Sequence, residues 1–257
     1  MKSRAYKYIY PDHGDGLTVS LIDNVEPYKG FWGHNEDIIL NKINEYIKGN
    51  INADDSFFLD AGCGNGRLLK KFGINFSNIV AIEPDENRLK EAIENIKFTD
   101  FYSKVTFLNV SAEELTCTHK FDVILSSHVL QHVHTDTVIK ILKNITSLLR
   151  NNGVLFLMTC HTVETDDCYA KDQYIDSKFI EENITKEDFN SLIFNNINVL
   201  PIHFFSKKTI IGLLKEAGFE IFDMEVFHNN RDIYLSARCN HSVNPVREQE
   251  MAVLAQP

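Results

Sequence analysis

A glycine-rich loop that begins with an acidic residue is the strongest chemical signal in the sequence. The loop comprises residues 60–66 (DAGCGNG). It begins at the end of the stretch SFFLDAG (56–62), which we interpret as a buried strand, and it leads into a helix. Glycines permit positive φ angles and let the backbone approach a ligand closely. Asp60 at the mouth of the loop would repel a pyrophosphate, but it suits a ligand that carries an ammonium group.

The spacing of the glycines limits the kind of ligand. A dinucleotide fingerprint needs the pattern G-x-G-x-x-G. Counted from Gly62, its third glycine would fall at position 67, which is Arg67. A phosphate-binding P-loop is excluded, because no G-K-[ST] follows the loop. The pattern therefore disfavours a nicotinamide oxidoreductase.

Glu83 is the second chemical signal. It ends the apolar stretch NIVAIE at 78–83 and lies 23 residues after Asp60. An acidic residue in this place can accept hydrogen bonds from both hydroxyl groups of a ribose. Taken alone, Glu83 is equally well explained as a solvated acid at a strand end. Together with the Asp60 loop, the ribose interpretation is favoured.

The elements that position these residues alternate between strand and helix. We expect buried strands at 56–62, 78–83, 104–110, 121–127 and 154–159, and helices at 34–48, 66–72, 85–97 and 135–150. This alternation predicts an α/β fold with a doubly wound, mostly parallel sheet and helices on both faces. Ligands of such sheets bind beyond the carboxyl ends of the strands, at the topological switch point.

We predict one domain with five parts. They are an N-terminal helical cap at 1–50, a core at 51–160, an insertion on the substrate side at 161–205, a terminal helix and hairpin at 206–240, and a tail at 241–257. The hairpin would add an antiparallel strand to the sheet. The stretch 164–188 is acidic, so it could attract a cationic substrate, although a solvated lid is the commoner role of such a segment.

Composition excludes several functions. The chain has 257 residues, 44% of them hydrophobic, and lacks an apolar stretch near the roughly 20 residues that a membrane helix needs. Its start shows no signal peptide, so we expect a cytoplasmic protein without membrane contact. Five irregularly spaced cysteines argue against disulfides and zinc. The net charge of −10 argues against direct nucleic-acid binding.

The motifs together resemble the class I, Rossmann-like family of S-adenosylmethionine (SAM)-dependent methyltransferases. The stretches that carry the resemblance are FFLDAGCGNG, VAIEPD, NVSAEEL, FDVILSSHVLQHV and LLRNNGVLFL, all within 56–160. The ending HFFSKKTIIGLLKEAGFEI is similar to the last helix and strand of that family. The resemblance implies a seven-stranded sheet with one antiparallel strand, SAM as the cofactor and S-adenosylhomocysteine as the product.

The resemblance also implies roles for particular residues. Asp60 would face the methionine ammonium group, Glu83 would hold the ribose, and the loop glycines would pack on the cofactor. The segment 111–113 would border the adenine, although the family often has an aspartate where this chain has Ser111. The full expected cofactor-binding set is Asp60, Gly62, Cys63, Gly64, Glu83, Pro84, Ser111, Ala112, Glu113, Ser127 and Trp32. Trp32 could cover the cofactor or simply pack the first helix onto the core.

Histidines gather after the fourth expected strand, at His128, His132 and His134. A metal site needs three or four ligands in suitable geometry, and no acidic residue or cysteine completes a set nearby in the sequence, so we expect no metal. Because this loop would border the methyl-transfer site, His128 and His132 are the candidates for a general base, with His161 as a further one. Neutral, hydrogen-bonded loop histidines are the alternative.

The sequence thus predicts an enzyme that moves a methyl group from SAM to an O, N or C nucleophile, with a small molecule as the favoured acceptor. A sulfonium donor is already activated, so the protein mainly has to align and desolvate the nucleophile. One alternative is a non-catalytic SAM-binding regulatory protein. Another is a methyltransferase that acts on protein or on tRNA with a partner. We expect a monomer or a homodimer.

Overall fold

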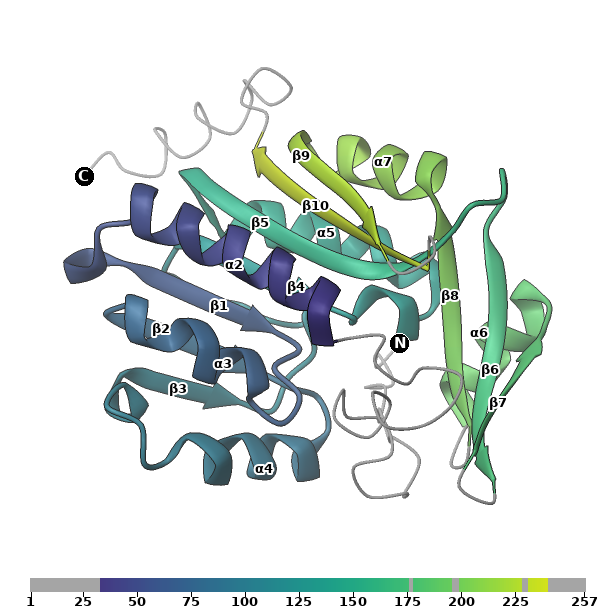
Figure 1. Cartoon of the computed structure of the whole chain (residues 1–257), viewed down its shortest axis with the longest axis horizontal. Helices are drawn as coiled ribbons and strands as arrows, with labels where there is room; N and C mark the ends of the chain where they lie inside the picture. The colour runs from purple at the N-terminus through teal and green to yellow at the C-terminus, as the bar shows by residue number, and fades with distance from the viewer. Residues whose placement is uncertain (1–32, 176–177, 196–198, 228–230, 240–257) are drawn as a thin grey trace, which may run out of the picture.

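The computed structural model describes residues 33–175, 178–195, 199–227 and 231–239 (Figure 1). Trp32 and the tail at 241–257 lie outside these residues, so the predictions for them are not addressed. Within the described part of the chain, no helix combines the length and the apolar character that a membrane crossing requires.

The central sheet has the predicted seven strands. Five parallel strands run in the order β3-β2-β1-β4-β5, β10 joins β5 antiparallel, and β9 pairs with β10. The bounds are β1 Phe57–Ala61, β2 Asn78–Ile82, β3 Val105–Leu108, β4 Phe121–Ser127, β5 Leu149–Thr162, β9 Phe219–Phe227 and β10 Asp232–Cys239. Because β1 lies between β2 and β4, the strand order reverses there, and this reversal is the switch point at which α/β sheets bind ligands.

Helices cover both faces of this sheet (Figure 1). Their bounds are α2 Gly33–Asn50, α3 Arg67–Phe72, α4 Glu86–Ile96, α5 Thr135–Leu148, α6 Lys186–Asn195 and α7 Lys207–Glu216, and 3-10 turns lie at Ala53–Asp55, Gly73–Asn75, Tyr102–Lys104 and Leu130–His132. Neighbouring strand residues face opposite sides. Phe58 joins the core under α2, α3 and α4, whereas Leu59 joins the core under α5 and α7. The predicted doubly wound α/β architecture is confirmed.

Local sequence signals fix the helix ends. The Asp85 side chain accepts hydrogen bonds from the backbone nitrogens of Asn87 at 2.8 Å and Arg88 at 3.1 Å, so it caps α4 as its sequence position predicts. Ser206 caps α7 through the backbone nitrogen of Thr209 at 3.2 Å. Both caps place the first turn of a helix directly after a strand.

The segment expected to be an insertion extends the sheet. β8 (Leu200–Ser206) pairs in parallel with the end of β5, β6 (Cys168–Ile175) pairs antiparallel with β8, and β7 (Lys178–Asn183) pairs antiparallel with β6. Figure 1 shows these three strands standing beyond the carboxyl ends of β1 and β3. They therefore form a wall beside the switch point, where the sequence predicted only an insertion near the active edge.

Candidate active site

The glycine loop folds over the end of β2. The backbone nitrogens of Gly62 and Cys63 both donate to the carbonyl oxygen of Ile82, each at 2.9 Å. Gly62 has a φ angle of 91°, and a Cβ atom there would come within 2.3 Å of the Val129 side chain. The loop therefore needs glycine at this position, both for its backbone angle and for its contact with the residue after His128.

Asp60 lies at the carboxyl end of β1 and is 1% exposed. Its Oδ2 atom is buried and accepts no hydrogen bond from the part of the chain that the structure describes. Burial raises the pKa of Asp60 to about 7, a shift that nearby Glu83 increases and the Arg67 guanidinium partly offsets. A buried carboxylate that lacks a hydrogen-bond donor is costly, so Asp60 offers a place for a cationic group of a ligand.

Glu83 follows β2 directly and is 4% exposed, so it is not the solvated acid that the sequence alone allowed. Its Oε2 accepts a hydrogen bond from the backbone nitrogen of Gly64 at 3.0 Å, and its Oε1 accepts one from Asp85 at 3.1 Å. Burial raises the pKa of Glu83, although these bonds and Arg88 oppose the shift. Each carboxylate oxygen has two acceptor positions, so Glu83 can still receive two ligand hydroxyl groups.

Asn109, two residues before the segment expected at the adenine, lies next to Glu83. The Asn109 side chain donates to the carbonyl oxygens of Glu83 at 2.9 Å and Pro84 at 3.0 Å, which joins the ends of β2 and β3. The Ser111 hydroxyl donates to Glu114 at 2.9 Å.

The remaining expected cofactor contacts have varied environments. Ala112 is buried, and Glu113 is half-buried, with a pKa that burial raises. Cys63 is buried beside the loop, and Ser127 is half-buried at the end of β4.

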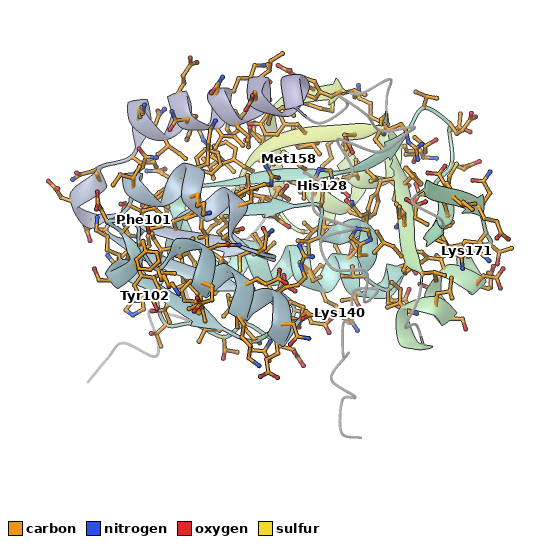
Figure 2. All side chains as sticks on the ribbon, turned by 60° about the horizontal axis from the view of Figure 1, so that its bottom comes forward. Phe101, Tyr102, His128, Lys140, Met158 and Lys171 are labelled. Atoms are coloured by element: carbon orange, nitrogen blue, oxygen red, sulfur yellow. The ribbon has the colours of Figure 1, made fainter. Side chains whose placement is uncertain are left out.

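His128 has an unusual backbone. Among the described residues it is the non-glycine residue with a positive φ angle, 55°. Its backbone nitrogen donates to the carbonyl oxygen of Met158 at 2.9 Å, so His128 lies beside the end of β5 (Figure 2). Backbone strain of this kind gathers at functional sites because only a well-determined surrounding structure can hold it.

Gln131 determines how the His128 ring is protonated. The Gln131 Oε1 atom accepts hydrogen bonds from the Cys160 backbone nitrogen at 3.1 Å and from the Thr159 hydroxyl at 3.2 Å. Its amide nitrogen therefore faces Nδ1 of His128, at 3.1 Å, and donates to it. It follows that Nδ1 carries the lone pair of the neutral ring, whereas Nε2 carries the proton.

The other two candidate histidines differ from His128. His132 is buried and donates from Nδ1 to the carbonyl oxygen of Pro201 at 2.8 Å, and burial lowers its pKa to about 4. His161 likewise donates from Nδ1 to the carbonyl oxygen of Phe205 at 2.9 Å, and burial lowers the pKa of His161 as well. Both rings attach β8 to the core, whereas the His128 ring is hydrogen-bonded to Gln131.

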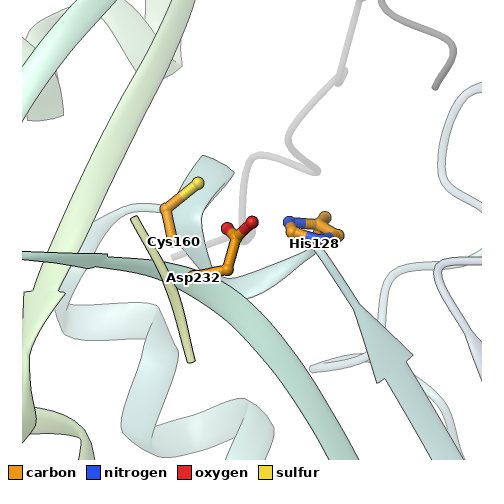
Figure 3. Close-up of side chains that lie close together, drawn as sticks. All are labelled: His128, Cys160 and Asp232. Atoms are coloured by element: carbon orange, nitrogen blue, oxygen red, sulfur yellow. The ribbon is translucent and has the colours of Figure 1, made fainter. Parts of the chain in front are cut away.

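Two further residues meet His128, and sequence reasoning did not select either. Cys160 and Asp232 face each other across β5 and β10, and one ligand atom from each lies within 4.8 Å of one from His128 (Figure 3). These three groups could bind a divalent cation, but burial raises the pKa of the Cys160 thiol far above its usual range. A metal ion would have to displace that proton. Asp232 is an isolated acidic residue at the start of β10, and no motif in the sequence around it marks it as a site residue.

Comparison with known proteins identifies the family and the fold of the chain. Residues 31–223 match a family model described as a methyltransferase domain. The chain belongs to this family. A solved S-adenosylmethionine-dependent methyltransferase from Clostridium acetobutylicum ATCC 824 superimposes on this methyltransferase domain with a TM-score of 0.60 at 16% identity, over 88% of this chain and 95% of the other. At that identity the likeness concerns the fold, and it confirms the mostly parallel sheet with its antiparallel strand.

Two curated relatives match part of the methyltransferase domain. A ubiquinone biosynthesis O-methyltransferase from Rickettsia bellii (strain OSU 85-389) is 28% identical over 123 residues, which are 48% of this chain and 50% of the relative. An alpha N-terminal protein methyltransferase 1 from Dictyostelium discoideum is 27% identical over 166 residues, or 62% and 58% of the two chains. The chain thus spans only about half the length of these relatives.

Proposed function

We propose that this protein transfers a methyl group from SAM to an O, N or C nucleophile of a small molecule and releases S-adenosylhomocysteine. The observation that carries the proposal is the pair of buried carboxylates, Asp60 and Glu83, at the ends of adjacent strands on either side of the glycine loop. Membership in the methyltransferase domain family supports the same activity.

The residues present fit the cofactor. We propose that the Oδ2 atom of Asp60, which is buried without a hydrogen-bond donor among the described residues, receives the methionine ammonium group, and that the remaining acceptor positions of Glu83 bind the two ribose hydroxyls. Gly62, Cys63 and Gly64 form the backbone on which the methionine end would pack. For the adenine end, we propose Pro84 together with the segment 111–113 as the border, and Ser127 on the methyl-donor side.

Methyl transfer from a sulfonium needs few catalytic side chains, because the donor is already activated. Bound SAM would supply an electrophilic methyl group, whose bond to sulfur breaks as the lone pair of the acceptor attacks. The chain has to align the acceptor and exclude water. Where the acceptor must lose a proton, we propose that the Gln131 amide turns away from His128 and that the freed lone pair of Nδ1 takes the proton. His132 is the second candidate, but a pKa of about 4 makes it a weak base at neutral pH.

The other expectations stay predictions. We propose a cytoplasmic enzyme, monomeric or homodimeric, that needs no metal ion and binds neither nucleic acid nor membrane directly, in keeping with its net charge of −10. The similarity to a protein methyltransferase in the comparison above makes a protein acceptor the second candidate function.

Two measurements test the proposal. Calorimetry with SAM, S-adenosylhomocysteine and NAD should show binding of the first two and none of the third. Mass spectrometry of a metabolite extract incubated with the protein and SAM should show a product heavier than its precursor by one methylene group. Binding without any product would favour a regulatory SAM-binding protein, and binding of NAD alone would contradict the site assignment.

A further inference from the structure

A charged cluster lies between the wall strands β6 and β7 and the start of β10, next to Cys160. It consists of Asp172, Glu181, Arg231 and Asp232. All four side chains are close enough to Cys160 to influence its ionisation: the three carboxylates raise its pKa and the guanidinium lowers it. Cys160 in turn lies within 4.8 Å of His128 and Asp232. Through Cys160 and Asp232, the cluster therefore reaches His128, the residue that follows β4.

The alternation of side chains along β6 places Asp172 on one face of the wall. Side chains alternate along β6, so Asp172 lies on the same face as Cys168 and Ala170. That face packs with Cys160 against three apolar side chains of β8, namely Leu200, Ile202 and Phe204. We call these three apolar side chains the apolar floor; it extends to Cys160, and Asp172 is a carboxylate at its edge.

Asp172 has the properties of a ligand-binding acid. It is 7% exposed, and its Oδ1 atom accepts no hydrogen bond from the described residues. Its strand neighbour Glu181 forms an ion pair with Arg231, and the Arg231 guanidinium lies 4.7 Å from the centre of the Phe204 ring. Burial and Glu181 raise the pKa of Asp172 to about 7, while Arg231 lowers it. A buried carboxylate oxygen that lacks a hydrogen-bond donor is costly, and the N–H groups of a ligand cation would supply one.

Among the described residues, the charged groups that act on Cys160 are the three carboxylates of Asp172, Glu181 and Asp232 and the guanidinium of Arg231. The nearby Lys171 belongs to the opposite face of β6, where it pairs with Glu182 at 2.9 Å. In this part of the chain, the face that leads to His128 therefore carries more carboxylates than cationic side chains.

We infer that the methyl acceptor is a cationic amine that the carboxylates of this cluster, Asp172 and Asp232 among them, attract, with its apolar part on Ile202. The inference rests on the proposed methyl transfer and specifies its substrate class. The ammonium group first gives a proton to His128 or to water. The free nitrogen pair then forms the bond to the methyl carbon while the bond between that carbon and sulfur breaks, and the pair of that bond stays on sulfur. The methylated ammonium product keeps its positive charge.

The test uses the full chain, methyl-tritiated SAM and a small-molecule extract of the source organism, separated by ion exchange at neutral pH into cationic, neutral and anionic fractions. We expect label in the cationic fraction, in a product that remains cationic and resists base hydrolysis. Label confined to the neutral or anionic fractions overturns the inference but not the proposed transfer. No label in any fraction, with SAM bound in calorimetry, overturns the transfer itself.

A parallel reaction with the peptides and proteins of the same extract identifies the source of the amine. Label on a peptide N-terminus or a lysine still supports the amine class and assigns it to protein. Label on a carboxylate or hydroxyl group of protein overturns it.

Variants then test the two carboxylates. Asp172→Asn and Asp232→Asn should each raise KM for the labelled amine about tenfold or more, since each removes a negative charge that attracts the amine, with S-adenosylhomocysteine affinity unchanged. Asp172→Glu, which keeps the charge, should recover part of the loss. Glu164→Gln is the matched control, because it removes one negative charge from an exposed position of the same segment. Unchanged KM in both Asn variants, with the cofactor still bound, overturns the inference.

Discussion

The Glu83 carboxylate accepts a hydrogen bond from the backbone nitrogen of Gly64 at 3.0 Å. This bond joins the acid at the end of β2 to the glycine loop at the end of β1. It makes Glu83 part of the support of the loop as well as a candidate ligand of the ribose. The two functions can be separated by comparing Glu83 with Asp60, whose Oδ2 atom supports no backbone group among the described residues.

Asp60→Ala and Glu83→Ala should each weaken SAM binding by about 1–3 kcal/mol, the usual cost of losing a hydrogen bond to a charged group. Isothermal calorimetry measures the change. Glu83→Ala should also lower the melting temperature of the free protein, because it leaves the nitrogens of Gly64 and Asp85 without their acceptor. Equal affinity of both variants and the wild type would disprove the site assignment.

The stability of the ligand-free protein should depend on the ionisation of Asp60. Its pKa is about 7 in the folded chain and 3.8 in the reference state, so the folded state holds the proton more tightly. The contribution of Asp60 to the free energy of unfolding is therefore largest below pH 3.8 and falls as the pH rises towards 7. Asp60→Asn should remove this component, which urea unfolding of both proteins across that range would reveal. Parallel curves for the two proteins would argue against a perturbed Asp60.

Gly62→Ala should destabilise the protein by about 1–3 kcal/mol and abolish SAM binding, because its Cβ would meet Val129 at 2.3 Å and its φ angle is 91°. Gly212→Ala is the matched control. Gly212 lies inside α7, and apart from the backbone of its own helix and its chain neighbours no atom of the described residues lies within 4 Å of the added Cβ, so the change should stabilise by about 0.5–1 kcal/mol. Thermal melts measure both, and a tolerated Gly62→Ala would mean that the loop is less constrained than its contacts indicate.

His128→Asn should lower kcat by about 10²-fold or more if His128 takes the acceptor proton. Asparagine tolerates a positive φ angle better than most residues, so the loop should keep its shape. Single-turnover measurements with saturating SAM isolate the chemical step. His132→Asn provides the comparison: it should mainly lower stability, since it disturbs the bond to Pro201. A kcat unaffected by His128→Asn would assign proton removal to water.

Removal of divalent cations should leave methyl transfer unchanged, since the proposed chemistry needs only alignment and proton transfer. Dialysis against a chelator followed by the standard assay measures this. The contrary result would be a loss of activity that zinc restores in the wild type and not in Cys160→Ser. That outcome would turn His128, Cys160 and Asp232 into a metal site.

Much of this protein follows from local sequence patterns. The seven-stranded order with its antiparallel strand matches what the family resemblance implied. The strand and helix alternation of the core matches the hydrophobic periodicity, and Asp85 and Ser206 cap the helices that follow them directly in the sequence. Such features can be read from the chain because hydrophobic periodicity and capping act over a few residues. Parallel strands also bring their carboxyl ends to one edge, so Asp60 and Glu83 could be placed together from their spacing alone.

The tertiary structure decided the rest. The buried face of β6 carries Cys168, Ala170 and Asp172, a set without the apolar alternation of a strand, so its pairing with β8 is not visible in the sequence. The sequence also could not separate His128 from His132, because their proton positions depend on Gln131 and Pro201. Burial, tautomer and charge surroundings are set by contacts between distant segments, and these contacts exist only after the chain has folded.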